Sequence, residues 1–408
     1  MAFWVMDEKN HPHNPIEEIL TITSVYKTAT TSAAWILPFE ILAVIAEGLD
    51  LATLKSWSLS SRSFQAEAAR HLWRSVRIHS RRPEYFFLLS KYSRLVKAVQ
   101  LFFYCESPKC AEEDVPLSQR MLSIVLCLPN LHSLDLKIVV LKDRLQQNCH
   151  IETQFFEADY SRLPLRQLSL SSGLIGVSLR SMISKFFSQL RYLSVLDISN
   201  LYLVNVDLNG NVVEDDGQWC KSGTLPQLVD LRCASITDLT LAGGCSLEAL
   251  RIHLGRLDPD SGIVAKFIKS MKTSKESLRM LHLSGQGQYA LSKMEMVFAI
   301  GVAFPKLREL SMNFPMRQDS KTWFNVDMEH VDEILAVLLG STANGGLRGL
   351  HQLKIVNPPF TTPARKHFIE GCSKIFGDSL HLKQKYLVGE GDLVTGLGTL
   401  ALLDSGTS

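Results

Sequence analysis

The stretch Leu131-His132-Ser133-Leu134-Asp135-Leu136 is one copy of a pattern that occurs eight times in the 408-residue chain. In each copy a leucine is followed three residues later by a second leucine, and two residues after that by another apolar residue. The copies begin at Leu131, Leu165, Leu193, Leu228, Leu247, Leu278, Leu307 and Leu350. Apolar residues in alternation follow the period of a β-strand, with the residue between them on the opposite face. Each strand is short, so neighbouring copies must stack to bury their leucines.

Amphipathic stretches separate the copies and predict helices between the strands. They cover Leu117–Cys127, Leu174–Gln189, Gly262–Met271, Leu291–Ala303, Val331–Leu339 and Pro363–Phe376. Prolines at 129, 164, 226 and 305 lie beside the repeat starts, where they end the preceding helix. A strand, a helix and a second strand in the same sense give a parallel sheet with right-handed crossovers.

This organisation resembles the leucine-rich repeat, whose regular unit is roughly 20 to 29 residues. The copies begin between 19 residues (228 to 247) and 43 residues (307 to 350) apart, and the usual Asn or Cys after the strand is mostly missing. We therefore expect an α/β fold in which an irregular leucine-rich-repeat-like solenoid carries a parallel sheet on its concave face. An ordinary α/β domain with leucine-rich strands is the alternative.

A second informative stretch, Leu37-Pro38-Phe39-Glu40-Ile41-Leu42, precedes the repeats. Proline suits the first turn of a helix, because it fixes φ and gives up an N–H that has no partner there. Leu37, Ile41, Ile45 and Leu49 then recur every four residues on one helix face. Asp50 is a candidate N-cap for a second helix, and a break at Ser60-Ser61 precedes a third.

Together, Leu37-Pro38, Leu49-Asp50, Arg62-Ser63-Phe64 and Leu72-Trp73-Arg74 resemble the F-box of substrate receptors in SCF-type ubiquitin ligases. An F-box followed by divergent leucine-rich repeats resembles in particular the F-box proteins of mushroom-forming fungi. The sequence departs from the F-box pattern at Ala46, Ser60, Ser61 and Phe64, and these changes reduce apolar area. A helical cap on a larger domain is the simpler alternative.

The resemblance implies a substrate-recognition subunit that docks on the adaptor subunit, and through it on a cullin, and binds a target protein with its repeats. The expected adaptor-binding residues are Leu37, Pro38, Ile41, Ile45, Leu49, Leu54, Leu59 and Trp73. The expected target-binding residues are the outward strand positions Asp135, Ser169, Asp197, Arg232, Arg251, His282, Ser311 and Lys354. The second hypothesis is a non-catalytic scaffold that is not assembled into a ligase.

Composition narrows the class of protein. With 46% hydrophobic and 21% charged residues the chain can bury a large core, and its net charge of +2 favours neither nucleic acid nor membrane as a partner. The run Arg70, Arg74, Arg77, Arg81 and Arg82 is interpreted as a solvated helix face. Eight cysteines without CxxC spacing indicate reduced thiols, and no signal peptide or membrane-length apolar run is visible, which predicts a cytoplasmic or nuclear location.

We expect a tail over residues 1–34, an F-box-like module over 35–79, the solenoid over 80–385 and a second tail over 386–408. An acidic insert loop is expected over Asn205–Gly223.

Motifs for chemistry are weak. Gly285-Gln286-Gly287-Gln288-Tyr289-Ala290 fits a dinucleotide-binding fingerprint, but its strand-loop-helix context recurs in every repeat without the glycines. His11 and His13 supply only two of the four ligands that a structural zinc needs, and His253 and His282 lie on outward strand positions. We therefore expect neither an enzyme nor a cofactor or metal, and a nucleotide-using enzyme built around Gly285 and Gly287 is the third hypothesis.

Overall fold

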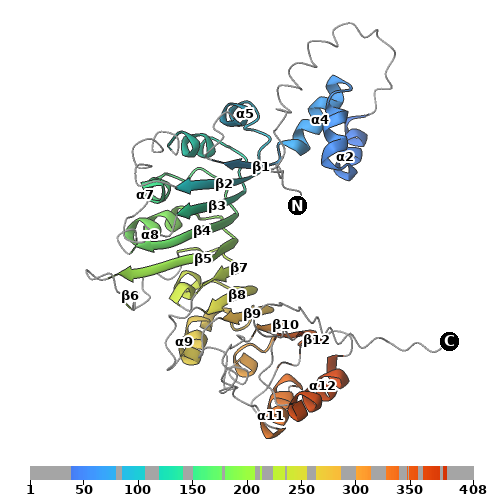
Figure 1. Cartoon of the computed structure of the whole chain (residues 1–408), viewed down its shortest axis with the longest axis vertical. Helices are drawn as coiled ribbons and strands as arrows, with labels where there is room; N and C mark the ends of the chain where they lie inside the picture. The colour runs from blue at the N-terminus through green and yellow to red at the C-terminus, as the bar shows by residue number, and fades with distance from the viewer. Residues whose placement is uncertain are drawn as a thin grey trace, which may run out of the picture. The chain divides into compact units, whose positions relative to one another are not determined.

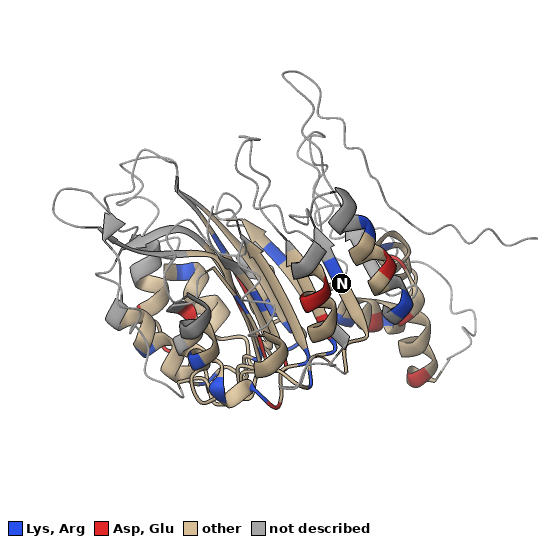
Figure 2. Ribbon diagram, turned by 90° about the horizontal axis from the view of Figure 1, so that it is seen from below, with Lys and Arg blue, Asp and Glu red and all other residues tan. Residues whose placement is uncertain are grey.

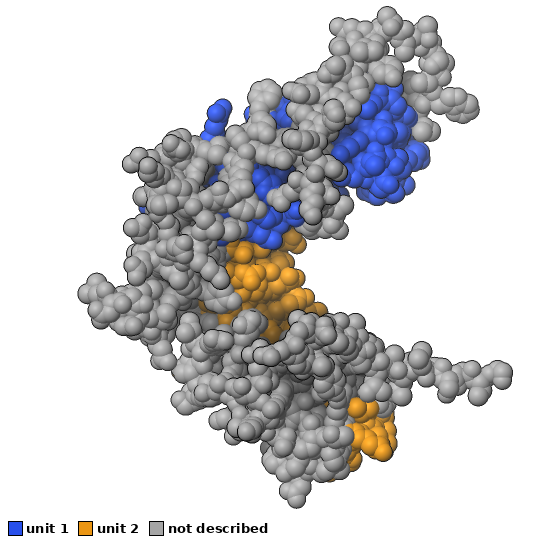
Figure 3. Space-filling model, in the orientation of Figure 1, with its two compact units in different colours: residues 1–142, 149–165 blue, residues 143–148, 166–408 orange. Residues whose placement is uncertain are grey.

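The computed structural model describes residues 38–79, 85–105, 119–140, 150–176, 180–206, 212–213, 224–234, 237–254, 263–285, 300–313, 328–339, 347, 349–356, 362–376 and 380–383. The chain forms two compact units, shown in Figure 3. Unit 1 contains residues 1–142 and 149–165, and unit 2 contains residues 143–148 and 166–408. The expected tails at 1–34 and 386–408 lie outside the described residues.

Three helices open unit 1, as predicted: α2 (Phe39–Gly48), α3 (Leu51–Ser58) and α4 (Arg62–Leu72). Pro38 directly precedes α2, and its carbonyl accepts the first backbone hydrogen bonds of the helix. The Asp50 carboxylate caps α3 by accepting from the Thr53 N–H at 2.7 Å. The Ser61 hydroxyl caps α4 by accepting from the Phe64 N–H at 3.2 Å. Short polar residues therefore set both helix starts.

The core of this helical module is small. Ala46, Leu54 and Ala68 are buried at its centre, and Leu49, Trp57 and Leu72 pack around them. Trp57 stacks on Phe64 with a ring-centroid distance of 4.5 Å. Alanines at the centre allow neighbouring helices to approach closely.

The sheet of unit 1 contains β1 (Ser75–His79), β2 (Ala98–Cys105) and β3 (Ser133–Val140). These strands pair in parallel, and Figure 1 shows them side by side and pointing the same way. The chain between them includes α5 (Tyr85–Lys91) and a helix over 119–126, and α7 (His150–Glu157) follows β3. Residues 75–79, which we had grouped with the F-box-like module, thus form the first strand of the sheet.

The described part of unit 2 contributes eight strands to the parallel sheet, in the order in which they occur in the sequence, and each described pair between them is parallel. They are β4 (Gln167–Gly176), β5 (Val195–Val206), β7 (Asp230–Cys233), β8 (Ala249–Leu254), β9 (Met280–Gly285), β10 (Glu309–Asn313), β11 (Gln352–Val356) and β12 (Leu380–Lys383). The described helices are α8 (Arg180–Gln189), η3 (Thr237–Ala242), α9 (Ile263–Ser270), η4 (Lys272–Ser274), residues 300–303, α11 (Met328–Leu339) and α12 (Thr362–Phe376).

The pattern leucines stack in register, as the sequence predicts. Leu196 pairs with Leu231, Leu231 with Leu250, and Leu250 with Leu281. The leading leucine of all eight copies is buried. A recurring backbone arrangement joins the repeats: at the start of a strand, two consecutive N–H groups donate to one carbonyl of the preceding repeat. It occurs before β2, β3, β5, β7, β8, β9, β10 and β11. The predicted fold class, α/β with leucine-rich-repeat-like alternation of strands and helices, is confirmed.

Side-chain hydrogen bonds add to these backbone hydrogen bonds between repeats, although the Asn that usually follows each strand is mostly missing. The buried Ser274 hydroxyl accepts from the Leu247 N–H at 3.1 Å and donates to the Cys245 carbonyl at 3.0 Å. The Cys245 thiol donates to the Leu225 carbonyl. Serine and cysteine side chains thus connect successive repeats by hydrogen bonds to backbone groups.

Three local predictions were wrong. The helix expected from Leu174 begins only at Arg180, because β4 continues to Gly176 after two register shifts beyond Ser169. The insert expected as a loop over Asn205–Gly223 is not loop throughout: Asn205 and Val206 belong to β5 and pair antiparallel with β6 (Val212–Val213), and the rest of the segment lies outside the described residues. Arg77 does not belong to a helix face; it lies in β1, where its Nε donates to the Gln100 side chain at 2.6 Å.

Candidate protein-binding surfaces

Exposed apolar side chains concentrate on the helical module. Among the described residues eight large apolar side chains are exposed, and five of them lie between residues 39 and 59. We call these five residues, Phe39, Ile41, Val44, Ile45 and Leu59, the apolar face; Ile41, Val44 and Ile45 among them share one side of α2. Val44 is 69% exposed and Ile41 is 47% exposed, although aliphatic side chains gain free energy from burial. A surface of this kind is typical of a protein interaction site.

The helical period explains how α2 carries this face. Leu42 and Ala46 are buried, whereas Ile41, Val44 and Ile45 are exposed on the neighbouring side of the helix. Gly48 continues that side one turn beyond Val44, and a Cβ added to it would have no heavy atom within 4 Å. The chain's own packing therefore does not require a glycine at this position.

The structure separates the predicted adaptor-binding residues into two groups. Pro38, Ile41, Ile45 and Leu59 are exposed, and they lie on or beside the apolar face. Leu49 and Leu54 instead belong to the core of the module, and Leu54 is only 6% exposed. Trp73 is half-buried and stacks on Tyr92 at a centroid distance of 4.5 Å. Leu37 lies outside the described residues.

Two residues of the apolar face were missed by the sequence analysis, Phe39 and Val44. The four-residue spacing from Leu37 selected only one row, and the neighbouring row at i+3 gives Val44. Phe39 additionally holds the Arg70 guanidinium over its ring, at 4.3 Å from the centroid. Arg70 in turn pairs with the buried Glu67 at 3.3 Å. The start of α2 is thereby tied to α4.

The departures from the F-box pattern at Ala46, Ser60 and Ser61 do not lie on the exposed side of α2. Ala46 is 1% exposed and sits in the core against Ala68. Ser61 caps α4, and the Ser60 hydroxyl donates to the Trp57 carbonyl at 2.6 Å. These residues therefore shape the interior and the helix starts, and they remove no apolar area from the exposed face of α2.

A second candidate surface is the sheet face that carries the outward strand residues, which we call the open face. In unit 2 the register places seven of the predicted target-binding residues in one continuous row across the strands. They are Ser169, Asp197, Arg232, Arg251, His282, Ser311 and Lys354, and all are half-buried. His381 continues the row on β12, where the sequence pattern did not identify a copy.

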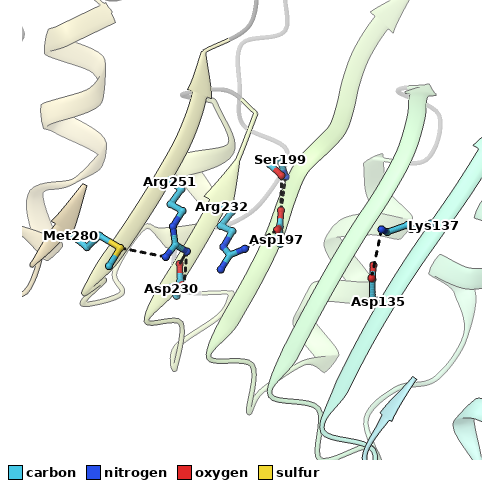
Figure 4. A network of polar contacts seen from close by, with 8 residues as sticks. All are labelled: Asp135, Lys137, Asp197, Ser199, Asp230, Arg232, Arg251 and Met280. Carbon is cyan, nitrogen blue, oxygen red and sulfur yellow. Dashed lines mark hydrogen bonds and ion pairs between the residues drawn. The ribbon is translucent and has the colours of Figure 1, made fainter. Parts of the chain in front are cut away.

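Two arginines of this row are neutralised locally, Arg232 by Asp197 within the row and Arg251 by Asp230, which lies two residues before Arg232 on β7. The Arg232 guanidinium lies 3.5 Å from the Asp197 carboxylate, and Arg251 lies 3.2 Å from Asp230 (Figure 4). Asp197 is further fixed by the N–H and hydroxyl of Ser199 at 3.1 and 2.7 Å. Partly exposed ion pairs of this kind contribute little to folding. They do orient charged groups on an exposed surface.

In unit 1 the corresponding row is Arg77, Gln100 and Asp135. The buried Gln100 amide accepts from Arg77 and donates to the Asp135 carboxylate. Phe102 lies beside this row, with His79 stacked on it at 4.7 Å and the Arg77 and Lys137 cations over its ring at 5.1 and 5.5 Å. Arg77, which the sequence analysis did not include, thus belongs to the open face.

Features that would indicate chemistry are few in the described part of the chain. No group of three or more His, Cys, Asp or Glu residues there could hold a metal ion. Burial raises the pKa of the Cys372 thiol to about 12 and also raises that of Cys245, so neither is an activated nucleophile. Gly285 ends β9, whereas Gly287, His11 and His13 lie outside the described residues.

None of the described helices is both long and apolar enough to cross a membrane.

No protein-family model matches the sequence, and no curated protein matches it. Among solved structures, the leucine-rich repeat-containing protein LegL7 from Legionella pneumophila is similar, with 12% sequence identity and a TM-score of 0.38. The alignment covers 75% of this chain and 94% of that chain.

Proposed function

We propose that the chain is the substrate-recognition subunit of an SCF-type cullin ubiquitin ligase. In this proposal α2–α4 dock on the adaptor subunit, and the open face of the sheet binds a target protein. The observation that carries the docking half is the exposed apolar side of α2, which lies next to a small core centred, among the described residues, on Ala46, Leu54 and Ala68. A partner that covers Ile41, Val44 and Ile45 would complete the burial that the module cannot achieve alone.

The target-binding half is supported by the ordered row of polar side chains on successive strands. Repeat proteins use such extended surfaces for protein recognition, because each repeat presents one set of side chains at a fixed spacing. The ion pairs Arg232–Asp197 and Arg251–Asp230 in unit 2 fit a partner surface of mixed charge. In this function the chain raises the local concentration of its target near the ubiquitin-carrying enzyme and makes no covalent bond itself.

The proposal is tested by titrating the purified adaptor against the full chain and two variants. In the face variant, Ile41→Asp and Val44→Asp place carboxylates on the apolar face. In the control, Val302→Asp places one on an equally exposed apolar side chain of a helix in unit 2. We expect the parent and the control to bind with 1:1 stoichiometry and the face variant to lose binding while keeping its helical circular dichroism. Retained binding by a folded face variant would exclude this docking surface.

The same titration distinguishes the proposed function as a ligase subunit from the second hypothesis, a scaffold. A scaffold that is not assembled into a ligase predicts no adaptor binding by the parent chain at all. Deleting residues 1–79 is a poorer test, because it also removes β1 and exposes the edge of β2.

A further inference from the structure

Positive charge is concentrated in the sheet of unit 1. The described segments 73–79, 85–105 and 119–140 contain seven basic residues, Arg74, Arg77, Lys91, Arg94, Lys97, Arg120 and Lys137, and one acidic residue, Asp135. The formal charge of these described segments is therefore 7 − 1 = +6. Figure 2 shows that basic and acidic residues are otherwise interspersed along the chain. The excess is thus local.

Four of these residues, Arg74, Lys91, Arg94 and Lys97, gather where the strands of unit 1 begin, and we call them the basic edge. Arg74 directly precedes β1 and Lys97 directly precedes β2, and the Arg74 carbonyl accepts from the N–H groups of Lys97 and Ala98 at 2.9 Å. The Asn130 amide donates to the Arg94 carbonyl at 2.7 Å, which places that turn beside the turn before β3. Backbone hydrogen bonds therefore hold these cations on adjacent turns.

Two stacked aromatic rings lie beside the basic edge. Trp73, next to Arg74, stacks on Tyr92 at 4.5 Å, and the Lys91 ammonium lies 5.4 Å from the centre of the Tyr92 ring. Each of the four basic side chains is exposed, and none has an ion-pair partner among the described residues. Like charges on neighbouring turns repel one another, so this arrangement contributes nothing to folding.

In unit 2, the turns that precede the strands carry acidic as well as basic side chains. Arg279 and Arg308 occupy the same positions relative to β9 and β10, but Glu248, Glu276 and Glu309 are interspersed with them. Lys306 there pairs with Glu276 at 3.4 Å. The uncompensated charge is therefore not a general property of the repeat.

We infer that the basic edge binds an acidic segment of a partner protein. Three adjacent strand starts span about 10 Å, which matches three to four residues of an extended peptide at about 3.3 Å each. Nucleic-acid binding that rests on phosphate contacts alone weakens steeply as salt rises, and four side chains supply few such contacts. Trp73 and Tyr92 are half-buried and each covers one ring face of the other, which reduces the ring surface on which a base could stack.

The test uses the full chain and fluorescein-labelled hexaglutamate, followed by fluorescence anisotropy at low salt. The edge variant carries Arg74→Gln, Arg94→Gln and Lys97→Gln. The matched control carries Lys275→Gln, Arg279→Gln and Arg308→Gln, which removes the same charge from exposed positions of unit 2. We expect affinity to fall at least about tenfold in the edge variant and less than about twofold in the control, because only the edge contacts the peptide.

Equal losses in the two variants, or no binding by the parent, would overturn the proposal. A labelled twelve-residue oligothymidine is measured in parallel. Tighter binding of this oligonucleotide than of hexaglutamate, with the same loss in the edge variant, would assign the edge to nucleic acid instead. Neither substitution set touches the apolar face, so adaptor binding should be unchanged in the edge variant. The two proposals can therefore fail independently.

Discussion

Gly301 provides a sharp test of how the helices of neighbouring repeats pack in unit 2. It lies in the helical residues 300–303, and a Cβ added there would fall 2.3 Å from Cγ1 of the buried Val337 in α11. Valine has one strongly preferred rotamer in a helix, so its methyl group cannot easily move away. The structure thus indicates that these two helices approach too closely for any side chain at residue 301.

The expected magnitude for Gly301→Ala follows from two opposing effects. Overpacking a core costs about 1 to 3 kcal/mol. Replacing glycine by alanine in a helix returns up to about 1 kcal/mol. The 2.3 Å approach to Val337 places the overpacking cost in the upper part of its range, about 2 to 3 kcal/mol, so we expect a net loss of about 1 to 2 kcal/mol. Gly48→Ala is the matched control, because its added Cβ has open space and should leave stability unchanged or slightly raised.

The assay is amide hydrogen exchange within α11, since a chain with two compact units need not unfold in one step. Exchange should be faster in Gly301→Ala than in the parent. Val337→Ala alone should also destabilise α11, but the double variant should lose at least about 1 kcal/mol less than the sum, because the clash is relieved. Unchanged or slower exchange in Gly301→Ala would refute the close approach.

Three further predictions concern other parts of the chain. Leu54→Ala should cost about 2 to 5 kcal/mol of unfolding free energy and Ile41→Ala less than about 0.5, measured by thermal denaturation; equal costs would contradict the division into core and apolar face. The pKa of Asp50 lies below its usual value of 3.8, chiefly because its carboxylate accepts from the Thr53 N–H, so its stabilisation is present above that value and is lost as the pH falls through the lower folded value. The melting temperature of the parent should therefore fall relative to Asp50→Asn below pH 3.8, and a constant difference would contradict the cap. In native protein at pH 8, iodoacetamide should modify the exposed Cys127 and leave the buried Cys372 unmodified, as measured by mass spectrometry of the labelled peptides. Modification of Cys372 as fast as that of Cys127 would contradict its burial.

The periodic features of the fold could be predicted from the sequence because each follows from one local rule. Alternating leucines identified the strands and their inward face, and the register then brings Asp197, Arg232 and Arg251 into one row. Pro38 and Asp50 marked helix starts because their chemistry is specific to those positions.

Features that depend on tertiary context could not be predicted in this way. The division of α2 into a buried side with Leu42 and Ala46 and an exposed side with Ile41 and Val44 depends on how α3 and α4 pack. Both sides are apolar, so their periodicity alone does not distinguish them. The role of Arg77 was missed because β1 has no leucine pattern. The extension of β4 to Gly176 involves irregular pairing, which sequence alternation does not signal.

Hydrogen–deuterium exchange of the full chain, with and without the purified adaptor subunit, tests the central claim most directly. Docking through the apolar face predicts slower exchange in residues 39–59 on addition of the adaptor, with β7–β10 unchanged. Binding of the adaptor without any protection of α2, or with protection confined to the open face of the sheet, would contradict the account.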